Sequence, residues 1–214
     1  MVGFELDSLS ALRKALATLH RDYRVPHVVI SSIPITSKRS LWIPERFTRL
    51  KWPTVEGITW AEDLLLCVTS SRWDDSTGTS SVYTMGIPQI KGFFSGVGDL
   101  FSALVLGHYS PTNDAAHDVT TDPLSRAVCN AIRTTHCILR KTAIASRRAP
   151  NALLDGDTDE ELDKKDPERR PRRMKTRELR LVGSIDVILS AGKQGELEEL
   201  EGFDEMEPWE DFWA

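Results

Sequence analysis

The sequence predicts an α/β fold in which a mostly parallel sheet is flanked by helices on both faces. Three observations predict it. A leucine-rich helical pattern precedes a short β-branched run at residues 25–33, two further strand-like runs flank a turn at residues 74–78, and the apolar segments that follow have helical spacing. Alternating helical and strand patterns are typical of α/β proteins, and a short run that is apolar throughout is typical of a buried strand.

The first helix and strand place two serines at a strand end. Leucines recur at three- and four-residue steps before Tyr23, and Asp7 or Ser8 can cap this helix. The strand follows Pro26 and ends at Ser31 and Ser32. Ligands of open α/β sheets gather at the carboxyl ends of strands, so these hydroxyls could contact a phosphate or a bound cation. A serine-rich turn without a ligand is the alternative.

Residues 36–61 form a connection with no clear period. They mix basic residues with Trp42, Trp52 and Trp60, a combination that can bind single-stranded nucleic acid. We expect instead that the tryptophans pack on the core. Apolar runs at residues 64–68 and 81–85 then predict a hairpin around the turn-rich residues 74–78.

The central feature of the chain is a glycine-rich turn that leads into an apolar helix at residues 91–109. Gly96, Val97, Gly98 and Asp99 precede a run of large apolar residues. The first amides of a helix have no partner within it and carry partial positive charge, so they favour an anion such as a phosphate. Asp99 would repel that anion and is better suited to accept a proton from an attacking hydroxyl. The alternative is a structural N-cap.

A second long helix is predicted to begin at Asp122 and Pro123, which suit the N-cap and the first helical position. Cys129, His136 and Cys137 fall at near-helical repeats in it. No fourth ligand lies nearby in the sequence, so core packing is favoured over a metal site. No residue is assigned as a direct metal ligand.

Composition divides the remainder of the chain. Residues 151–177 are densely charged with almost no apolar content, and we expect a disordered insertion there. The basic run at residues 169–175 suggests a nuclear address or a polyanion contact, but a solvated loop is favoured. Residues 178–190 are expected to form a terminal strand, and residues 191–214 an acidic, disordered tail that could dock a partner.

Charge and cysteine content limit the possible partners. The 214 residues carry a net charge of −5, but nine acids and one base lie in residues 193–214, and residues 1–192 alone carry +3. A nearly neutral body argues for neither nucleic acid nor membrane as a partner. Three cysteines without metal-type spacing suit a reducing compartment, and no signal peptide or apolar span is visible. We expect a soluble cytoplasmic protein without disulfides, for which an additional nuclear location is open.

Three segments in order resemble one family. GVGDLFSALVLG, which contains Asp99, resembles the Gly-x-Gly-Asp signature of ribokinase-like kinases, and its continuation is most similar to the pyridoxal kinase branch. VPHVVISSI resembles the strand that carries a phosphate-side Ser/Thr pair, and ELRLVGSID resembles the terminal strand. The match covers most of residues 4–145 and 178–188. It implies the C-terminal, ATP-binding part of a ribokinase-like domain over residues 1–150, completed by residues 178–190, and nothing resembles the family's N-terminal half.

The resemblance implies transfer of the γ-phosphoryl group of ATP to the 5'-hydroxymethyl group of pyridoxal, pyridoxine or pyridoxamine, for pyridoxal 5'-phosphate salvage. Asp99 would be the catalytic base, and the amides of Gly96, Val97 and Gly98 the anion hole. Ser31 and Ser32 would lie by the phosphates or a K⁺ ion, with Mg²⁺ on the phosphates. A homodimer is also implied. The alternatives are an inactive, truncated remnant that acts as a nucleotide-binding or interaction module, and a kinase for another hydroxymethyl compound or a sugar.

Overall fold

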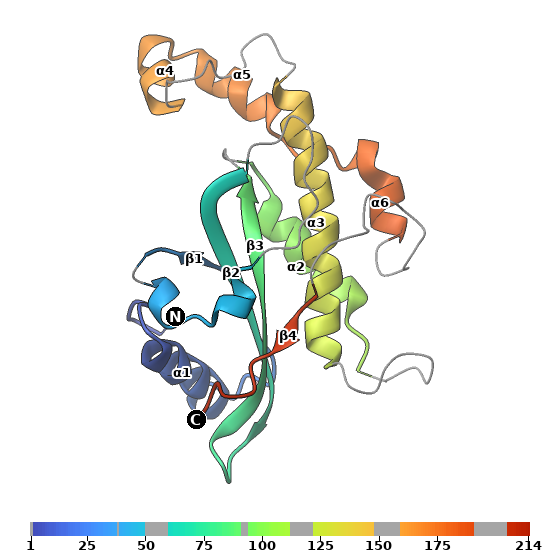
Figure 1. The fold of residues 1–214 in the computed structure, drawn as a ribbon. Helices are drawn as coiled ribbons and strands as arrows, with labels where there is room; N and C mark the ends of the chain where they lie inside the picture. Colours follow the sequence, from blue (N-terminus) through green and yellow to red (C-terminus); the bar gives the residue numbers. More distant parts are fainter. Residues whose placement is uncertain are drawn as a thin grey trace.

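A computed structural model describes residues 2–37, 39–49, 60–90, 94–111, 122–147, 159–190 and 205–214. A four-stranded sheet in the order β1-β2-β3-β4 lies at its centre. Figure 1 shows α1 on one side of this sheet and α3 with α2 on the other. The predicted α/β class, with helices on both faces, is therefore confirmed.

The first helix begins at its predicted cap. The hydroxyl of Ser8 accepts a hydrogen bond from the amide of Ala11 (3.2 Å) at the start of α1, Leu9–Ala17. The chain continues as one turn of π-helix, Thr18–Asp22, and enters β1, Val28–Ile35. Between β1 and β2, two short 3-10 turns, Arg39–Leu41 and Glu45–Phe47, belong to the described residues.

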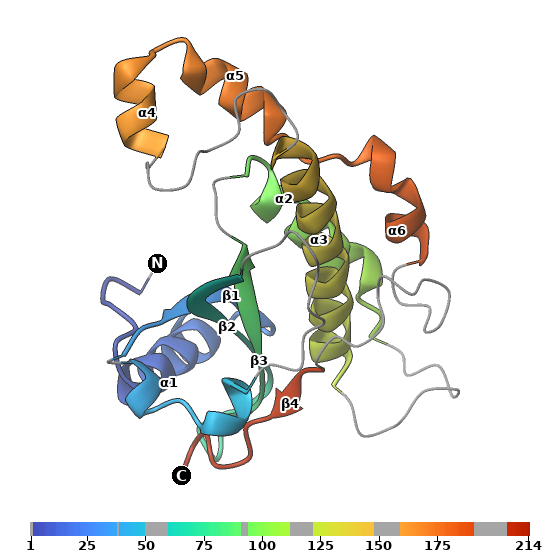
Figure 2. The same ribbon diagram turned by 45° about the horizontal axis from the view of Figure 1, so that its top comes forward.

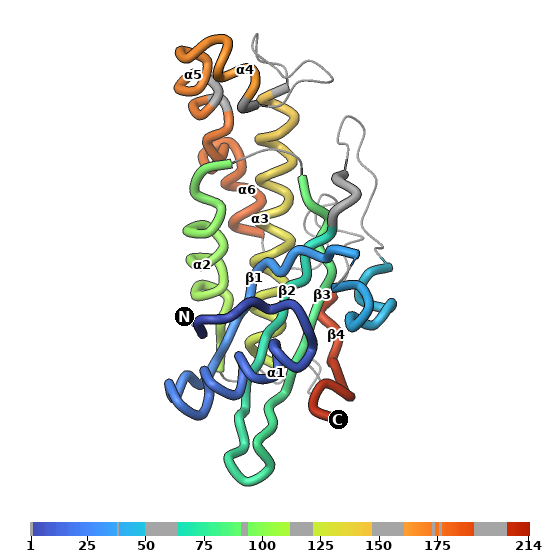
Figure 3. The backbone as a smooth tube through the Cα atoms, turned by 90° about the vertical axis from the view of Figure 1, so that its left-hand side faces the viewer, coloured from blue at the N-terminus to red at the C-terminus, as the bar shows by residue number. Residues whose placement is uncertain are grey.

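The predicted strand direction is wrong, because every neighbouring pair in the described sheet is antiparallel. β2, Trp60–Asp74, pairs with β1 and with β3, Thr79–Ile90. β3 also pairs with the short strand β4, Glu207–Pro208. A tight hairpin links β2 and β3, which forces opposite directions, whereas parallel neighbours require a long crossover. The hairpin itself is confirmed, and it extends beyond the rest of the sheet at one end (Figure 3).

Side chains of β2 and β3 alternate between two cores, as a period of two requires. Leu66 and Val68 pack with α1, whereas Cys67 and Met85 pack with α3. Each face of the sheet is thereby covered by a separate apolar cluster. Trp42, from the connection at residues 36–61, is half-buried against the α1 cluster, while Trp52 lies outside the described residues.

Two helices cover the second face of the sheet. The helix after the glycine turn is α2, Val97–His108, and α3, Pro123–Arg147, packs beside it. The carboxylate of Asp122 caps α3 by accepting a hydrogen bond from the amide of Ser125 (3.0 Å), as predicted. Cys129, His136 and Cys137 are all buried in the core that α3 forms.

The predicted disordered insertion contains two helices, so the prediction is wrong for its described part. Asp159–Lys165 is α4 and Arg169–Thr176 is α5, while residues 151–158 lie outside the described residues. In α4 the acids come first and the lysines last, which suits the helix dipole. The buried Arg169 guanidinium pairs with the Asp163 carboxylate at 2.7 Å. This ion pair joins α4 to α5.

The predicted terminal strand at residues 178–190 is also wrong. Glu178 makes a single parallel bridge with Ser95, and the chain then forms a 3-10 turn, Val182–Ser184, and the helix α6, Ile185–Ser190. Asp186 lies in the first turn of α6, and the pKa of its carboxyl is lowered by a hydrogen bond from the Val187 amide. An acid at this position stabilises a helix start.

The end of the acidic tail is part of the core, which corrects the prediction of a disordered appendage. Trp209 and Phe212 are buried with α1, and the Trp209 amide donates to the carbonyl of Val82 (2.9 Å). The Trp213 indole donates to the Ser80 carbonyl (2.9 Å). Met206, Trp209 and Phe212 recur at three-residue steps and are buried, while the acidic side chains between them remain exposed. Residues 191–204 lie outside the described residues.

Within the described ranges, no helix is both long enough and apolar enough to span a bilayer.

Candidate functional site

The predicted glycine turn is a sharp turn at the start of α2. Gly96 adopts a left-handed conformation (φ 84°) and is the N-cap of α2. It has no side chain that could accept a hydrogen bond from the helix. Its carbonyl accepts the first helical hydrogen bond from the Leu100 amide (3.0 Å). The amides of Val97, Gly98 and Asp99 therefore occupy the first turn, where a helix leaves its N–H groups unpaired.

Asp99 occupies the third position of the helix, so the alternative that it serves as the N-cap is excluded. Its side chain is exposed, and within the described structure it makes no hydrogen bond or ion pair. A carboxylate in the first turn is stabilised by the helix dipole, which compensates for the missing partner. Asp99 is thus available as an acceptor at the mouth of the turn.

Gly98 leaves space in front of the turn. A Cβ placed on Gly98 would meet no atom within 4 Å, whereas one on Gly96 would lie 3.8 Å from the Leu179 side chain. The outer side of the turn is consequently open at Gly98 and backed by Leu179 at Gly96. An anion could approach the backbone amides from the Gly98 side.

Residues 178–180 support the turn from behind. Glu178 bridges to Ser95, which immediately precedes the turn. The amide of Arg180 donates to the hydroxyl of Thr142 in α3 (3.2 Å), and this hydroxyl in turn donates to the Ile138 carbonyl (2.8 Å). The glycine turn and the last part of α3 are thereby held together by one short segment.

Ser31 and Ser32 are exposed on β1, but not at its end as predicted. They lie where the pairing with β2 is irregular, between Ile30 and Ile33. β1 and β3 both run antiparallel to β2, so both strands terminate at the same end of the sheet, from which the chain leads to α2. Among the described residues, no hydrogen bond joins either serine to the glycine turn. β1, which carries the two serines, therefore ends at the same end of the sheet as β3, which leads to the glycine turn. The serines and the turn are nevertheless not joined by a hydrogen bond in the described part of the chain.

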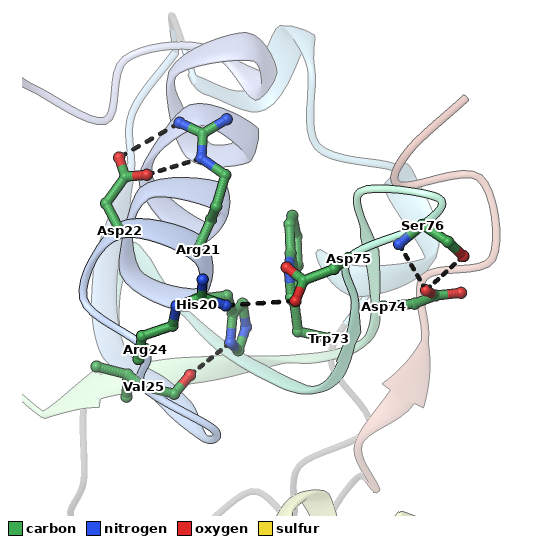
Figure 4. Close-up of polar contacts among 9 residues, drawn as sticks. All are labelled: His20, Arg21, Asp22, Arg24, Val25, Trp73, Asp74, Asp75 and Ser76. Atoms are coloured by element: carbon green, nitrogen blue, oxygen red, sulfur yellow. Dashed lines mark hydrogen bonds and ion pairs between the residues drawn. The ribbon is translucent and has the colours of Figure 1, made fainter.

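A second polar cluster lies beside the turn of the β2–β3 hairpin (Figure 4). The His20 Nδ1 lies 2.7 Å from the Val25 carbonyl, and the Nε2 lies 2.7 Å from the Ser70 hydroxyl. Because a carbonyl can only accept, Nδ1 must donate and Nε2 must accept in the neutral ring. Burial lowers the pKa of His20, which favours this neutral form. Ser70 is fully buried, so the pair is a structural tether rather than a nucleophile.

The sequence analysis did not identify two cationic residues, Lys141 and Arg180, that lie together in the structure. A surface hollow of ≈ 440 Å³ is lined by Lys141, Ile144, Ala145 and Arg180. Lys141, Ile144 and Ala145 share one face of α3, but Arg180 comes from a segment predicted to be a strand. The helical spacing of Lys141, Ile144 and Ala145 indicates from the sequence that they are neighbours. The position of Arg180 beside them follows only from the fold. None of the predicted site residues lines this hollow.

No three His, Cys, Asp or Glu side chains of the described ranges gather into a possible metal site.

Comparison with known proteins supports the resemblance found in the sequence. A provisionally named pyridoxal kinase of Schizosaccharomyces pombe is 29% identical over 152 residues, which cover 66% of this chain and 40% of the relative. No family model matches the chain.

Solved structures show the same fold. A Leishmania donovani pyridoxal kinase in complex with ADP matches 97% of this chain with a TM-score of 0.56 and 19% identity. The same enzyme in complex with ADP and pyridoxamine matches with a TM-score of 0.53 and 20% identity. In both cases the chain covers 47% of the solved structure.

The chain thus spans less than half the length of the relatives that it matches. The expected resemblance to pyridoxal kinases is confirmed, and the chain has the α/β fold of part of a pyridoxal kinase.

Proposed function

We propose that this chain is the nucleotide-binding part of a pyridoxal kinase-like phosphotransferase. It would transfer the γ-phosphoryl group of ATP to the 5'-hydroxymethyl group of a B6 vitamer. The observation that carries the proposal is the start of α2, where an open glycine turn and an exposed, unpaired Asp99 adjoin. The similar solved structures contain ADP, which supports the proposal that this chain binds a nucleotide.

The two parts of the turn would act on different atoms. The amides of the first turn of α2, including those of Val97 and Gly98, would donate to the phosphoryl oxygens as charge develops on them. Preorganised donors of this kind contribute about 3–4 kcal/mol when one is lost in other enzymes. Asp99 would accept the hydroxyl proton while the new oxygen–phosphorus bond forms and the bond to ADP breaks.

The other groups proposed to contact the phosphates lie outside the glycine turn. Ser31 and Ser32, which are exposed on β1, would approach the phosphates or a K⁺ ion from that strand. Mg²⁺, when bound, would offset phosphate charge, as in phosphoryl transfer generally. The described side chains do not form a metal cage, so the steps assigned to this chain use the turn and Asp99 alone.

The deciding experiment measures pyridoxal 5'-phosphate formed from pyridoxal and ATP by the purified chain, with Asp99→Asn in parallel. The variant should lose activity by about 10²- to 10⁴-fold, because it removes the proton acceptor. ADP affinity, measured by calorimetry, should be unchanged or slightly stronger, because the amides remain and a negative charge is removed. Wild-type turnover in Asp99→Asn would refute the role of this residue.

A second candidate is a nucleotide-binding module without kinase activity. The observation in its favour is that the chain covers less than half of each solved kinase that it matches. The same assay separates the two candidates. A folded chain that binds ADP and forms no pyridoxal 5'-phosphate would support the module, whereas turnover lost in Asp99→Asn would support the kinase.

A further inference from the structure

The hollow beside α3 combines positive charge with an apolar floor. Lys141, Ile144 and Ala145 are spaced so that they lie on one side of the last turns of α3. The segment between α5 and α6 passes across this end of α3 and adds Arg180 (Figure 2). The apolar part belongs to a helix and the cationic part to both elements.

The backbone of Arg180 is held in place. Its amide donates to the buried hydroxyl of Thr142 (3.2 Å), and the Leu181 amide donates to the Leu179 carbonyl (2.9 Å). The Arg180 side chain is exposed and is not needed for either contact. A cation is therefore presented at the hollow by a fixed main chain, which lowers the ordering cost of binding.

The charges around the hollow do not cancel. The Lys141 ammonium lies 3.4 Å from the Asp186 carboxylate, which is about half exposed. Within the described part of the chain, by contrast, the Arg180 guanidinium has no acidic partner. One unneutralised guanidinium, whose planar fork matches a phosphate, faces the hollow next to Ile144 and Ala145.

We propose that this hollow binds an organic phosphate, with the phosphate on Arg180 and the apolar or aromatic part on Ile144 and Ala145. Lys141 stays paired with Asp186 and offsets the charge of that carboxylate, which would otherwise repel the phosphate. The site is separate from the glycine turn, since none of its lining residues belongs to the turn. It does not depend on the proposed kinase activity.

The test is a calorimetric titration of the full chain with phenyl phosphate, with inorganic phosphate and phenol as partial probes. Phenyl phosphate should bind more tightly than either part. Arg180→Gln should weaken it about tenfold or more, because a charge-assisted, bidentate contact is lost. Lys141→Gln should weaken it less. Arg49→Gln removes an exposed arginine of the connection at residues 36–61 and should match the wild type.

The Ile144 methyl resonances locate the binding. Phenyl phosphate should shift them in the wild type and in Asp99→Asn alike, because the aromatic ring lies against this side chain. Unchanged affinity in Arg180→Gln, or binding without an Ile144 shift, would place the ligand elsewhere, for example in the glycine turn, and overturn the inference. No binding of phenyl phosphate by the wild type would overturn it as well. Neither result requires or affects the phosphorylation assay.

Discussion

Lowering the pH from 7 to 5 should destabilise the chain by about 2 kcal/mol through His136 alone. This side chain lies in the core between α3 and β3, where its Nε2 is 3.2 Å from the Pro88 carbonyl. Burial lowers the pKa of His136 from 6.5 to about 3, and the charge of Arg140 adds to this effect. The folded chain therefore holds this imidazole neutral.

The sign and size follow from proton binding. Between the folded pKa of about 3 and the unfolded value of 6.5, the unfolded state binds one more proton, so stability falls as the pH falls. A pH of 5 lies ~1.5 units below the pKa of the unfolded imidazole, and each unit changes the free energy of unfolding by about 1.4 kcal/mol. Near pH 7 the same group contributes almost nothing. Burial also lowers the pKa values of His20 and His108, which adds loss in the same direction.

Urea unfolding at the two pH values, followed by tryptophan fluorescence, measures this effect. His136→Gln keeps an amide donor for Pro88 and cannot titrate, so its loss between pH 7 and 5 should be smaller than that of the wild type by about 2 kcal/mol. An equal pH-dependent loss in His136→Gln and wild type would refute the assignment to this buried ring.

Three substitutions test the turn and the C-terminal segment. Gly98→Val should weaken ADP binding, measured by calorimetry, because its side chain enters the open space before the amides, whereas Gly107→Val at the other end of α2 should not. Equal affinities would count against an anion at the turn. Gly96→Ala should lower the free energy of unfolding in urea by roughly 1–2 kcal/mol, since φ is 84° there; an unchanged midpoint would show that the turn tolerates a side chain. Trp209→Ala should cost about 3–5 kcal/mol in the same assay, because a buried aromatic side chain is lost, and a loss below ~1 kcal/mol would contradict its place in the core.

Local chemistry made several parts of the fold predictable. Ser8 and Asp122 cap the helices that they were expected to cap, because an N-cap depends on a hydroxyl or carboxylate within three residues of the amide that it accepts from. The left-handed conformation of Gly96, which the sequence analysis did not specify, is likewise set within one turn of chain. Each of these features is decided by neighbours in the sequence.

Features that depend on distant residues were missed. The direction of β1 is set by its pairing with β2, and apolar composition alone does not distinguish a parallel from an antiparallel neighbour. The acidic tail was assigned from its average composition, yet Trp209 and Phe212 pack in the apolar cluster between α1 and the sheet. Ordering of α5 depends in part on the contact of Arg169 with Asp163 of α4.

The same distinction separates the reactive group of the proposed site from its support. Asp99 and the amides beside it can be found from a few consecutive letters, because a helix start needs only its own backbone. Their position relative to α3 depends on Glu178, which bridges to Ser95, and on Arg180, which bonds Thr142. Spacing in the sequence carries no information about such contacts. A loss of this segment should therefore disturb the turn even though Asp99 is unchanged, and substitution at Thr142 offers a way to separate the support from the chemistry.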